Sequence, residues 1–166
     1  MPKTITKLVT KAEEDINYIL QDFKDPWNLD GASLWVMNAN KKMVMKHQNL
    51  DVYDLLKSSD TFKIVKDANF FTILTCGWAA PLEELGDNVP SESPNRRRVR
   101  LLVGADFSGV ASVLRFQDDP DKTIVDEGKA NGTLAQAVDK LVKKKLKHQI
   151  NKVTNEIKEM MEEDTQ

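Results

Sequence analysis

Apolar residues recur at helical spacing at both ends of the chain. Between residues 4 and 23 they follow steps of four and three, at Ile5, Val9, Ala12, Ile16, Ile19 and Phe23. A repeat of 3.5 residues is typical of helices that pack nearly parallel or antiparallel to a neighbour. A second helical pattern runs from Thr133 to about residue 163. The apolar positions of its second half follow the same steps, and we call them the C-terminal seam: Leu146, Ile150, Val153, Ile157 and Met160.

The pattern in the middle of the chain predicts strands. Residues 32–48 and 97–116 each contain two alternating segments around a short turn, which indicates two hairpins. Residues 69–79, NFFTILTCGWA, are apolar on both faces and predict a central strand that is covered on each side. Residues 50–59 predict a short helix, with Asp51 as its candidate N-cap.

These elements occur in the order αββαβββα, which predicts an α+β fold with helices packed on an antiparallel five-stranded sheet. The same order is found in roadblock and profilin-like folds, an analogy that constrains function little. We expect a single domain over residues 1–166. Its parts are an N-terminal helix (1–24), a sheet core with one short helix (32–117) and a long C-terminal helix (133–164).

Charges along the two terminal helices predict that these helices pair with each other. The first helix begins basic and turns acidic near Glu13, whereas the last helix is basic over residues 140–152 and acidic over residues 156–164. Both gradients oppose the helix macrodipole, and an antiparallel pair would relieve both. The last helix would be about 45 Å long and would extend past the body of the domain. We therefore expect the C-terminal seam to pack on a second copy or another protein, with packing inside the same chain as the alternative.

The overall composition narrows the classes of partner. The formal net charge is −2, so any binding of nucleic acid would have to be local. No run approaches the roughly 18 apolar residues of a membrane span, and the start lacks the apolar segment of a signal peptide. We expect no membrane partner and a cytoplasmic location, in the host cell or in the virion if a phage encodes the chain. Frequent lysine and asparagine fit an AT-rich bacterial or phage genome.

Residues with catalytic or metal-binding chemistry are sparse. The only histidines are His47 and His148, and the single cysteine, Cys76, falls in the predicted central strand, where a thiol is usually inert. No cysteine or histidine pair has the spacing of a metal site. Residues 118–121 contain three aspartates but lack the order of a calcium loop, and we interpret them as a solvated turn. The sequence therefore predicts no catalytic residue, no metal and no cofactor. An enzyme using Cys76, His47 or acids near Arg115 is the least favoured alternative.

Arginine is concentrated in one stretch. Four of the five arginines lie within residues 93–102, whereas lysine is spread along the chain. Side chains alternate along a strand, so pairing of the hairpin brings Arg98, Arg100 and Arg115 onto one face of the sheet. Such a cluster needs anions, and three sources are open: the acidic loops at 83–92 and 118–121, a carboxylate on a partner or second copy, or phosphate. A carboxylate is favoured over phosphate because the chain is net acidic and has no recognised nucleic-acid motif.

Three segments together carry a family resemblance: TCGWAAP (75–81), SESPNRRRVRLLV (91–103) and GVASVLRF (109–116). Their order resembles that in an uncharacterised family of short actinobacterial and phage proteins. The resemblance covers about residues 69–140 and implies no known activity. It implies that the three sheet arginines form one constellation with Trp78 and Ser91.

Taken together, these patterns favour a non-enzymatic accessory or structural protein of a phage or bacterium. We expect it to act through protein–protein contacts and to form a homo-oligomer. The alternative is a nucleic-acid-binding protein that uses the Arg96–Arg100 strand and the lysine-rich C-terminal helix.

Overall fold

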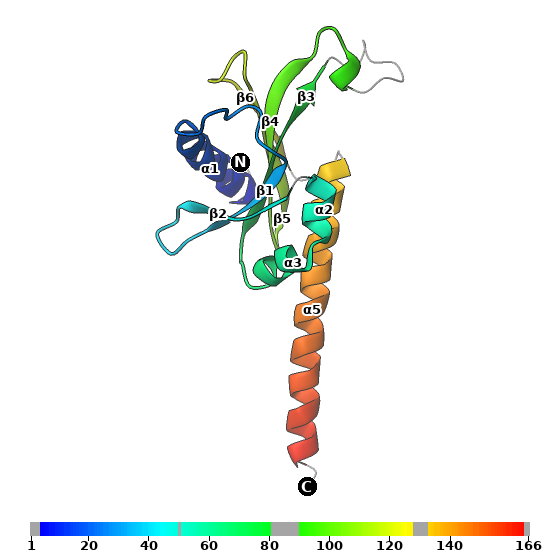
Figure 1. The fold of residues 1–166 in the computed structure, drawn as a ribbon. Coiled ribbons are helices and arrows are strands. Elements are labelled where there is room, and N and C mark those ends of the chain that lie inside the picture. The colour runs from blue at the N-terminus through cyan, green and yellow to red at the C-terminus, as the bar shows by residue number, and fades with distance from the viewer. Residues whose placement is uncertain (1–3, 50, 81–89, 128–132, 165–166) are drawn as a thin grey trace.

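The computed structural model describes residues 4–49, 51–80, 90–127 and 133–164. It confirms the α+β fold, with helices on both faces of an antiparallel sheet (Figure 1). In chain order the elements are α1 (Thr4–Leu20), β1 (Ala32–Met37), β2 (Met43–Asn49), α2 (Val52–Lys57), α3 (Ser59–Val65), β3 (Phe71–Ala79), η1 (Pro90–Glu92), β4 (Arg97–Asp106), β5 (Gly109–Phe116), β6 (Thr123–Glu127) and α5 (Thr133–Asp164).

The sheet has six strands in the order β2-β1-β3-β4-β5-β6, and every neighbouring pair is antiparallel. The prediction of five strands missed β6, which pairs with β5 from Arg115↔Thr123 to Ala111↔Glu127. This edge strand has only five residues, TIVDE, and lies in a stretch dominated by aspartates. Its Ile124 and Val125 are partly exposed, so the sequence lacks the apolar run of a central strand.

The predicted short helix over residues 50–59 corresponds to α2, and a second short helix, α3, follows it beyond the predicted range. Asp51 caps the first of them as expected, because its carboxylate accepts hydrogen bonds from the N–H groups of Tyr53 and Asp54. Ser58 divides the two, since its extended backbone ends α2 and its hydroxyl accepts a hydrogen bond from the N–H of Asp60 at the start of α3.

The two terminal helices do not pair, so that prediction is wrong. Helix α1 packs on one face of the sheet, which we call the α1 face, and α5 packs with α2 and α3 on the opposite face (Figure 1). Both sheet faces are apolar, and each helix covers one of them. The buried stripe of α1 lies against Trp35, Leu74, Leu102 and Val113, and consists of Ile5, Val9, Ala12, Ile16 and Leu20.

Helix α5 is 32 residues long, which confirms the long C-terminal helix. Its first three turns bury Leu134, Val138 and Leu141 in the core. Its last contacts with the body come from residues 145–149. The Lys145 ammonium donates to the Ala68 carbonyl, and the Gln149 amide donates to the Lys66 carbonyl at 3.5 Å. Beyond this point α5 projects away from the sheet (Figure 1), and residues 150–162 are all exposed.

Within the residues that the structure describes, no helix is long and apolar enough to cross a membrane.

Candidate functional site

The arginine-rich segment forms the start of β4. Its register places Arg100 directly opposite Arg115 of β5, and Arg98 opposite Trp78 of β3. Because paired residues project to the same side, Arg98, Arg100 and Arg115 share the α1 face, as strand alternation predicts. The face is covered rather than open, however, and Arg100 and Arg115 are only 3% and 7% exposed.

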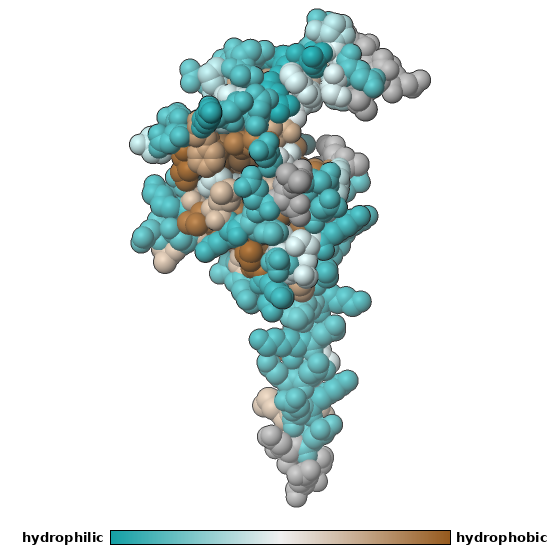
Figure 2. Space-filling view, in the orientation of Figure 1, coloured by the Kyte–Doolittle hydropathy of each residue, from teal (hydrophilic) through white to brown (hydrophobic). Residues whose placement is uncertain are grey.

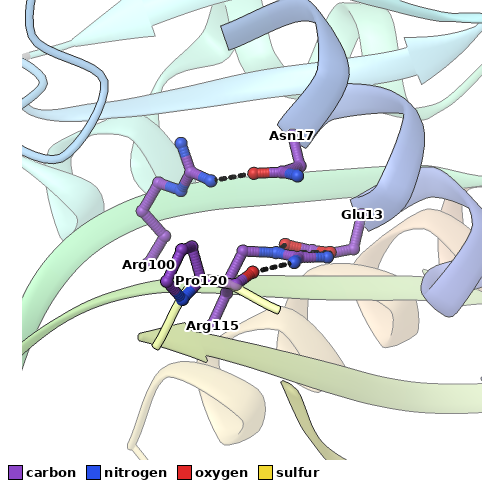
Figure 3. A network of polar contacts seen from close by, with 5 residues as sticks. All are labelled: Glu13, Asn17, Arg100, Arg115 and Pro120. Carbon is purple, nitrogen blue, oxygen red and sulfur yellow. Dashed lines mark hydrogen bonds and ion pairs between the residues drawn. The ribbon is translucent and has the colours of Figure 1, made fainter. Parts of the chain in front are cut away.

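Arg115 forms a buried ion pair with Glu13 of α1 (Figure 3). Its Nε and Nη2 atoms donate to the Glu13 carboxylate, with the Nη2–Oε1 distance 2.5 Å and the Nε–Oε2 distance 2.9 Å. Its Nη1 atom donates to the Pro120 carbonyl at 2.5 Å. The hydrogen bonds to Glu13 are the main cause that raises the pKa of Arg115 above its ordinary value. The pair therefore joins α1 to β5 and to the turn before β6.

Arg100 is buried beside this pair, and none of its hydrogen bonds within the described residues goes to a carboxylate. Its guanidinium donates to the Asn17 side chain of α1 (Figure 3). It also donates to the Pro26 carbonyl at 3.3 Å. It also lies over the Trp27 ring, 4.0 Å from the ring centroid. Burial is the main cause that lowers the pKa of Arg100. Neutral acceptors and an aromatic face thus replace water around this cation.

Near the end of β3, two further arginines stack on the indole ring of Trp78. The guanidiniums of Arg96 and Arg98 lie 4.8 and 4.9 Å from the centroid of the Trp78 ring. The Nε atom of Arg98 donates to the Trp27 carbonyl at 2.8 Å. Trp78 remains 39% exposed. Ser91, in η1, is exposed, and no hydrogen bond among the described residues joins its side chain to these groups.

Arg97 points to the other face of the sheet. Its Nε and Nη2 atoms donate to the carboxylate of Asp118 at 2.8 and 2.6 Å. This pairing raises the pKa of Arg97 and lowers that of Asp118. The aspartate-rich turn thus supplies one anion, but to a different arginine from those of the predicted cluster.

The main counter-ion of the cluster, Glu13, was not foreseen from the sequence. Residues 83–89 of the proposed acidic loops lie outside the described residues, and the structure supplies the anion from a helix instead. The available signal was position: Glu13 follows Ala12 and lies four residues after Val9, so it borders the buried stripe of α1. The arrangement fastens α1 and the segment at residues 26–27 to the sheet, which is a structural role.

The candidate catalytic residues are not brought together. Cys76 lies on the α1 face of β3, whereas His47 of β2 pairs with Leu34 and lies on the opposite face. The His148 ring packs edge-on against Phe62, with 5.7 Å between ring centroids. Across the described parts of the chain, no group of three or more His, Cys, Asp or Glu residues is arranged to hold a metal ion.

The C-terminal seam lies on the projecting part of α5. Its five side chains are exposed by 44, 55, 53, 52 and 65% from Leu146 to Met160, and Met161 beside them by 63%. The face of the projection turned to the viewer in Figure 2 is mostly hydrophilic, as expected for an amphipathic helix. The seam begins where α5 makes its last contacts with the body, so these side chains do not contribute to the core.

No protein-family model, curated protein or solved structure matches this chain. The likeness to roadblock and profilin-like folds therefore rests on element order alone. The resemblance of residues 69–140 to short actinobacterial and phage proteins stays a prediction. The case for a function depends on the chain's own surfaces, to which the C-terminal seam contributes five exposed apolar side chains.

Proposed function

We propose that this chain is a non-enzymatic accessory or structural protein of a phage or bacterium that acts through protein–protein contacts and self-associates. We place its action in the cytoplasm of the cell, or in the virion if a phage encodes it. The observation that carries the proposal is the C-terminal seam, whose five apolar side chains are all exposed along one side of a projecting helix.

An exposed apolar helix face of this kind is unusual for a chain that acts alone. Isolated helices of this length are marginal in water, and most helical stability in proteins comes from packing an apolar face. Burying a side chain of this size contributes about 1.5–3 kcal/mol. A seam on each of two helices can therefore offset the roughly 4–15 kcal/mol that association costs in lost freedom.

The sheet arginines give less support to the alternative of nucleic-acid binding. Arg100 and Arg115 are buried, and Arg97 is paired with Asp118. Binding of phosphate would have to rely on Arg96, Arg98 and the exposed lysines of α5. A mobility-shift titration at low ionic strength tests this alternative, because contacts with phosphates weaken steeply as salt is added.

Light scattering tests the self-association. We expect the full chain to form a dimer or larger assembly, and a chain ending at Gln149 to be a monomer. The double variant Ile150→Ser, Ile157→Ser should also be a monomer, because it removes two central seam side chains. The matched control, Asn151→Ser, Asn155→Ser, changes the same turns outside the seam and should assemble like the full chain. A monomeric full chain would contradict the proposal.

A further inference from the structure

We propose that two copies pair through the C-terminal seam with their α5 helices antiparallel, each helix tip beside the base of the other projection. This inference rests on the self-association proposed above and adds the partner's orientation and register.

The distribution of charge along α5 favours this orientation. A basic band surrounds the base of the projection, and an acidic band forms its tip. The basic band comprises Lys140, Lys143, Lys144, Lys147 and Lys152, and the acidic band comprises Glu156, Glu159, Glu162, Glu163 and Asp164. Parallel helices would set the two acidic tips side by side, whereas antiparallel helices that overlap over residues 146–164 set each acidic tip beside Lys147 and Lys152 of the basic band.

The helix macrodipole adds to this preference. An acidic tip lies at the negative end of α5, where carboxylates are destabilising. A neighbouring basic band would offset that effect. Helix α1 cannot supply it, since α1 lies across the sheet from α5. Within α5, the base shows an ion pair from Lys143 to Asp139 at 3.0 Å, and the Lys143 side chain is still 74% exposed. The base is thus open to an approaching acidic helix.

The length of the projection suggests the register. If each tip reaches the level of Leu146, beside the last contacts of α5 with the body, residues 146–164 of the two copies overlap end to end. Ile150 then lies opposite Met160 of the other copy, and Val153 lies opposite Ile157. Twofold symmetry repeats these contacts and gives four apolar layers.

Disulfide cross-linking tests the orientation. The variants carry Cys76→Ala so that no native thiol interferes. In the antiparallel register, Ile150 and its own symmetry mate are ten residues apart along the axis, about 15 Å. That exceeds the roughly 7 Å between Cα atoms that a disulfide can bridge. We therefore expect a covalent dimer from the double variant Ile150→Cys, Met160→Cys, and none from either single variant.

The results of cross-linking and light scattering distinguish the proposed antiparallel orientation from the proposed self-association. Covalent dimers from the single variants would show parallel helices and overturn the orientation while leaving self-association in place. Absence of cross-links from every variant, with a dimer still seen by light scattering, would overturn the register and the antiparallel pairing through this seam. A monomeric full chain would instead overturn the proposed self-association itself.

Neutralising part of the acidic band gives an independent test of the helix orientation. Replacing Glu159, Glu162 and Glu163 by Gln removes attraction in the antiparallel dimer but repulsion in a parallel one. We expect self-association to weaken about tenfold, because twofold symmetry makes six interhelical pairs that contribute a few tenths of a kcal/mol each. Salt should weaken the wild-type dimer in the same direction, because it screens exposed charges. Tighter association in either experiment would contradict the antiparallel arrangement.

Discussion

At the scale of single residues, the ion pair between Arg115 and Glu13 is the main polar contact of the α1 face. Both side chains are nearly inaccessible to solvent, at 9% and 5%. A buried pair is not itself strong evidence for stability, because desolvation of both ions offsets their attraction. Removing one partner alone does destabilise the fold, because it leaves a buried charge uncompensated. Here that charge would lie beside Arg100, a second buried cation.

Glu13→Ala should therefore lower the free energy of unfolding by about 3–5 kcal/mol. Urea unfolding measures the change, and Glu14→Ala is the matched control because Glu14 is exposed at the next position. We expect the control to change stability by less than about 0.5 kcal/mol. Equal effects of the two substitutions would show that helix propensity, rather than the ion pair, decides the outcome.

Lys145 gives a prediction about pH. Its ammonium is buried, donates to the Ala68 carbonyl and lies 4.7 Å from the Phe107 ring centroid. Burial is the main cause that lowers its pKa. Between this folded-state pKa and the unfolded value of about 10.4, the unfolded chain binds the proton that the folded chain releases. The contribution of Lys145 to stability therefore rises as pH rises through that window.

Urea unfolding at a series of alkaline pH values checks this sign. The difference in unfolding free energy between the wild type and Lys145→Met should grow in favour of the wild type as pH rises. The exposed Lys147→Met serves as the matched control for replacing a lysine of α5 by methionine. A constant difference for both variants would count against a depressed pKa at Lys145.

Strand alternation was sufficient to place Arg98, Arg100 and Arg115 on one face of the sheet, because a hairpin fixes which residues lie opposite each other. It could not identify Glu13 or Asn17 as their partners. These residues come from a helix about a hundred positions earlier. Which face of the sheet that helix covers is determined by tertiary packing. Both faces of this sheet are apolar, so the sequence does not distinguish them.

At the scale of elements, the packing of α1 on β4 depends on a small residue. A Cβ atom at Gly104 would lie 2.5 Å from the Val9 Cγ2 atom and 3.1 Å from the Thr72 Cγ2 atom. Helix and sheet are therefore in direct contact at this point. By contrast, a Cβ atom at Gly77 on β3 would meet nothing within 4 Å.

Gly104→Ala should destabilise the fold by about 1–3 kcal/mol, because it overpacks the contact with Val9. Gly77→Ala is the control and should be neutral or slightly stabilising, since alanine loses less backbone freedom than glycine on folding. Thermal unfolding distinguishes them. Adding Val9→Ala to Gly104→Ala should recover part of the lost stability, and a purely additive double variant would count against the contact.

Most elements were predictable from the sequence, but three features of their arrangement were not. The strand β6 is short and acidic, so its pairing with β5 comes from the neighbouring strand rather than from its own pattern. Ser58 fell near the end of the helix predicted over residues 50–59, but its hydroxyl caps a second helix, α3, that the sequence pattern did not predict. The charge gradients of α1 and α5 suggested a mutual pair, whereas burial against two apolar sheet faces determined where each helix lies.

At the scale of the whole molecule, α5 divides into a part that holds the fold and a part that does not. Leu141 is 5% exposed within the core, and Ile157 is 52% exposed on the projection. The C-terminal seam could be read from the sequence because its period is regular. Its exposure could not, since the same spacing would serve a helix buried along its whole length.

Leu141→Ala should cost about 2–5 kcal/mol of stability, as expected for a buried leucine. Ile157→Ala should leave unfolding of the dilute protein almost unchanged, but should weaken its assembly. Unfolding measured at low and high protein concentration checks both parts, because association makes apparent stability depend on concentration. A loss with Ile157→Ala in the dilute protein would mean that the projection folds back on the body.

The contact between Glu13 and Arg115 joins residues 102 positions apart, which has a consequence for the order of folding. Helix α1 packs mainly on β4 and β5, so it has no complete surface to dock on until β5 has been synthesised. At about 5–20 residues per second, translation of that interval takes roughly 5–20 s. During this interval the apolar stripe of α1 stays uncovered, and the hairpin of β4 and β5 must form before α1 can pack on the sheet.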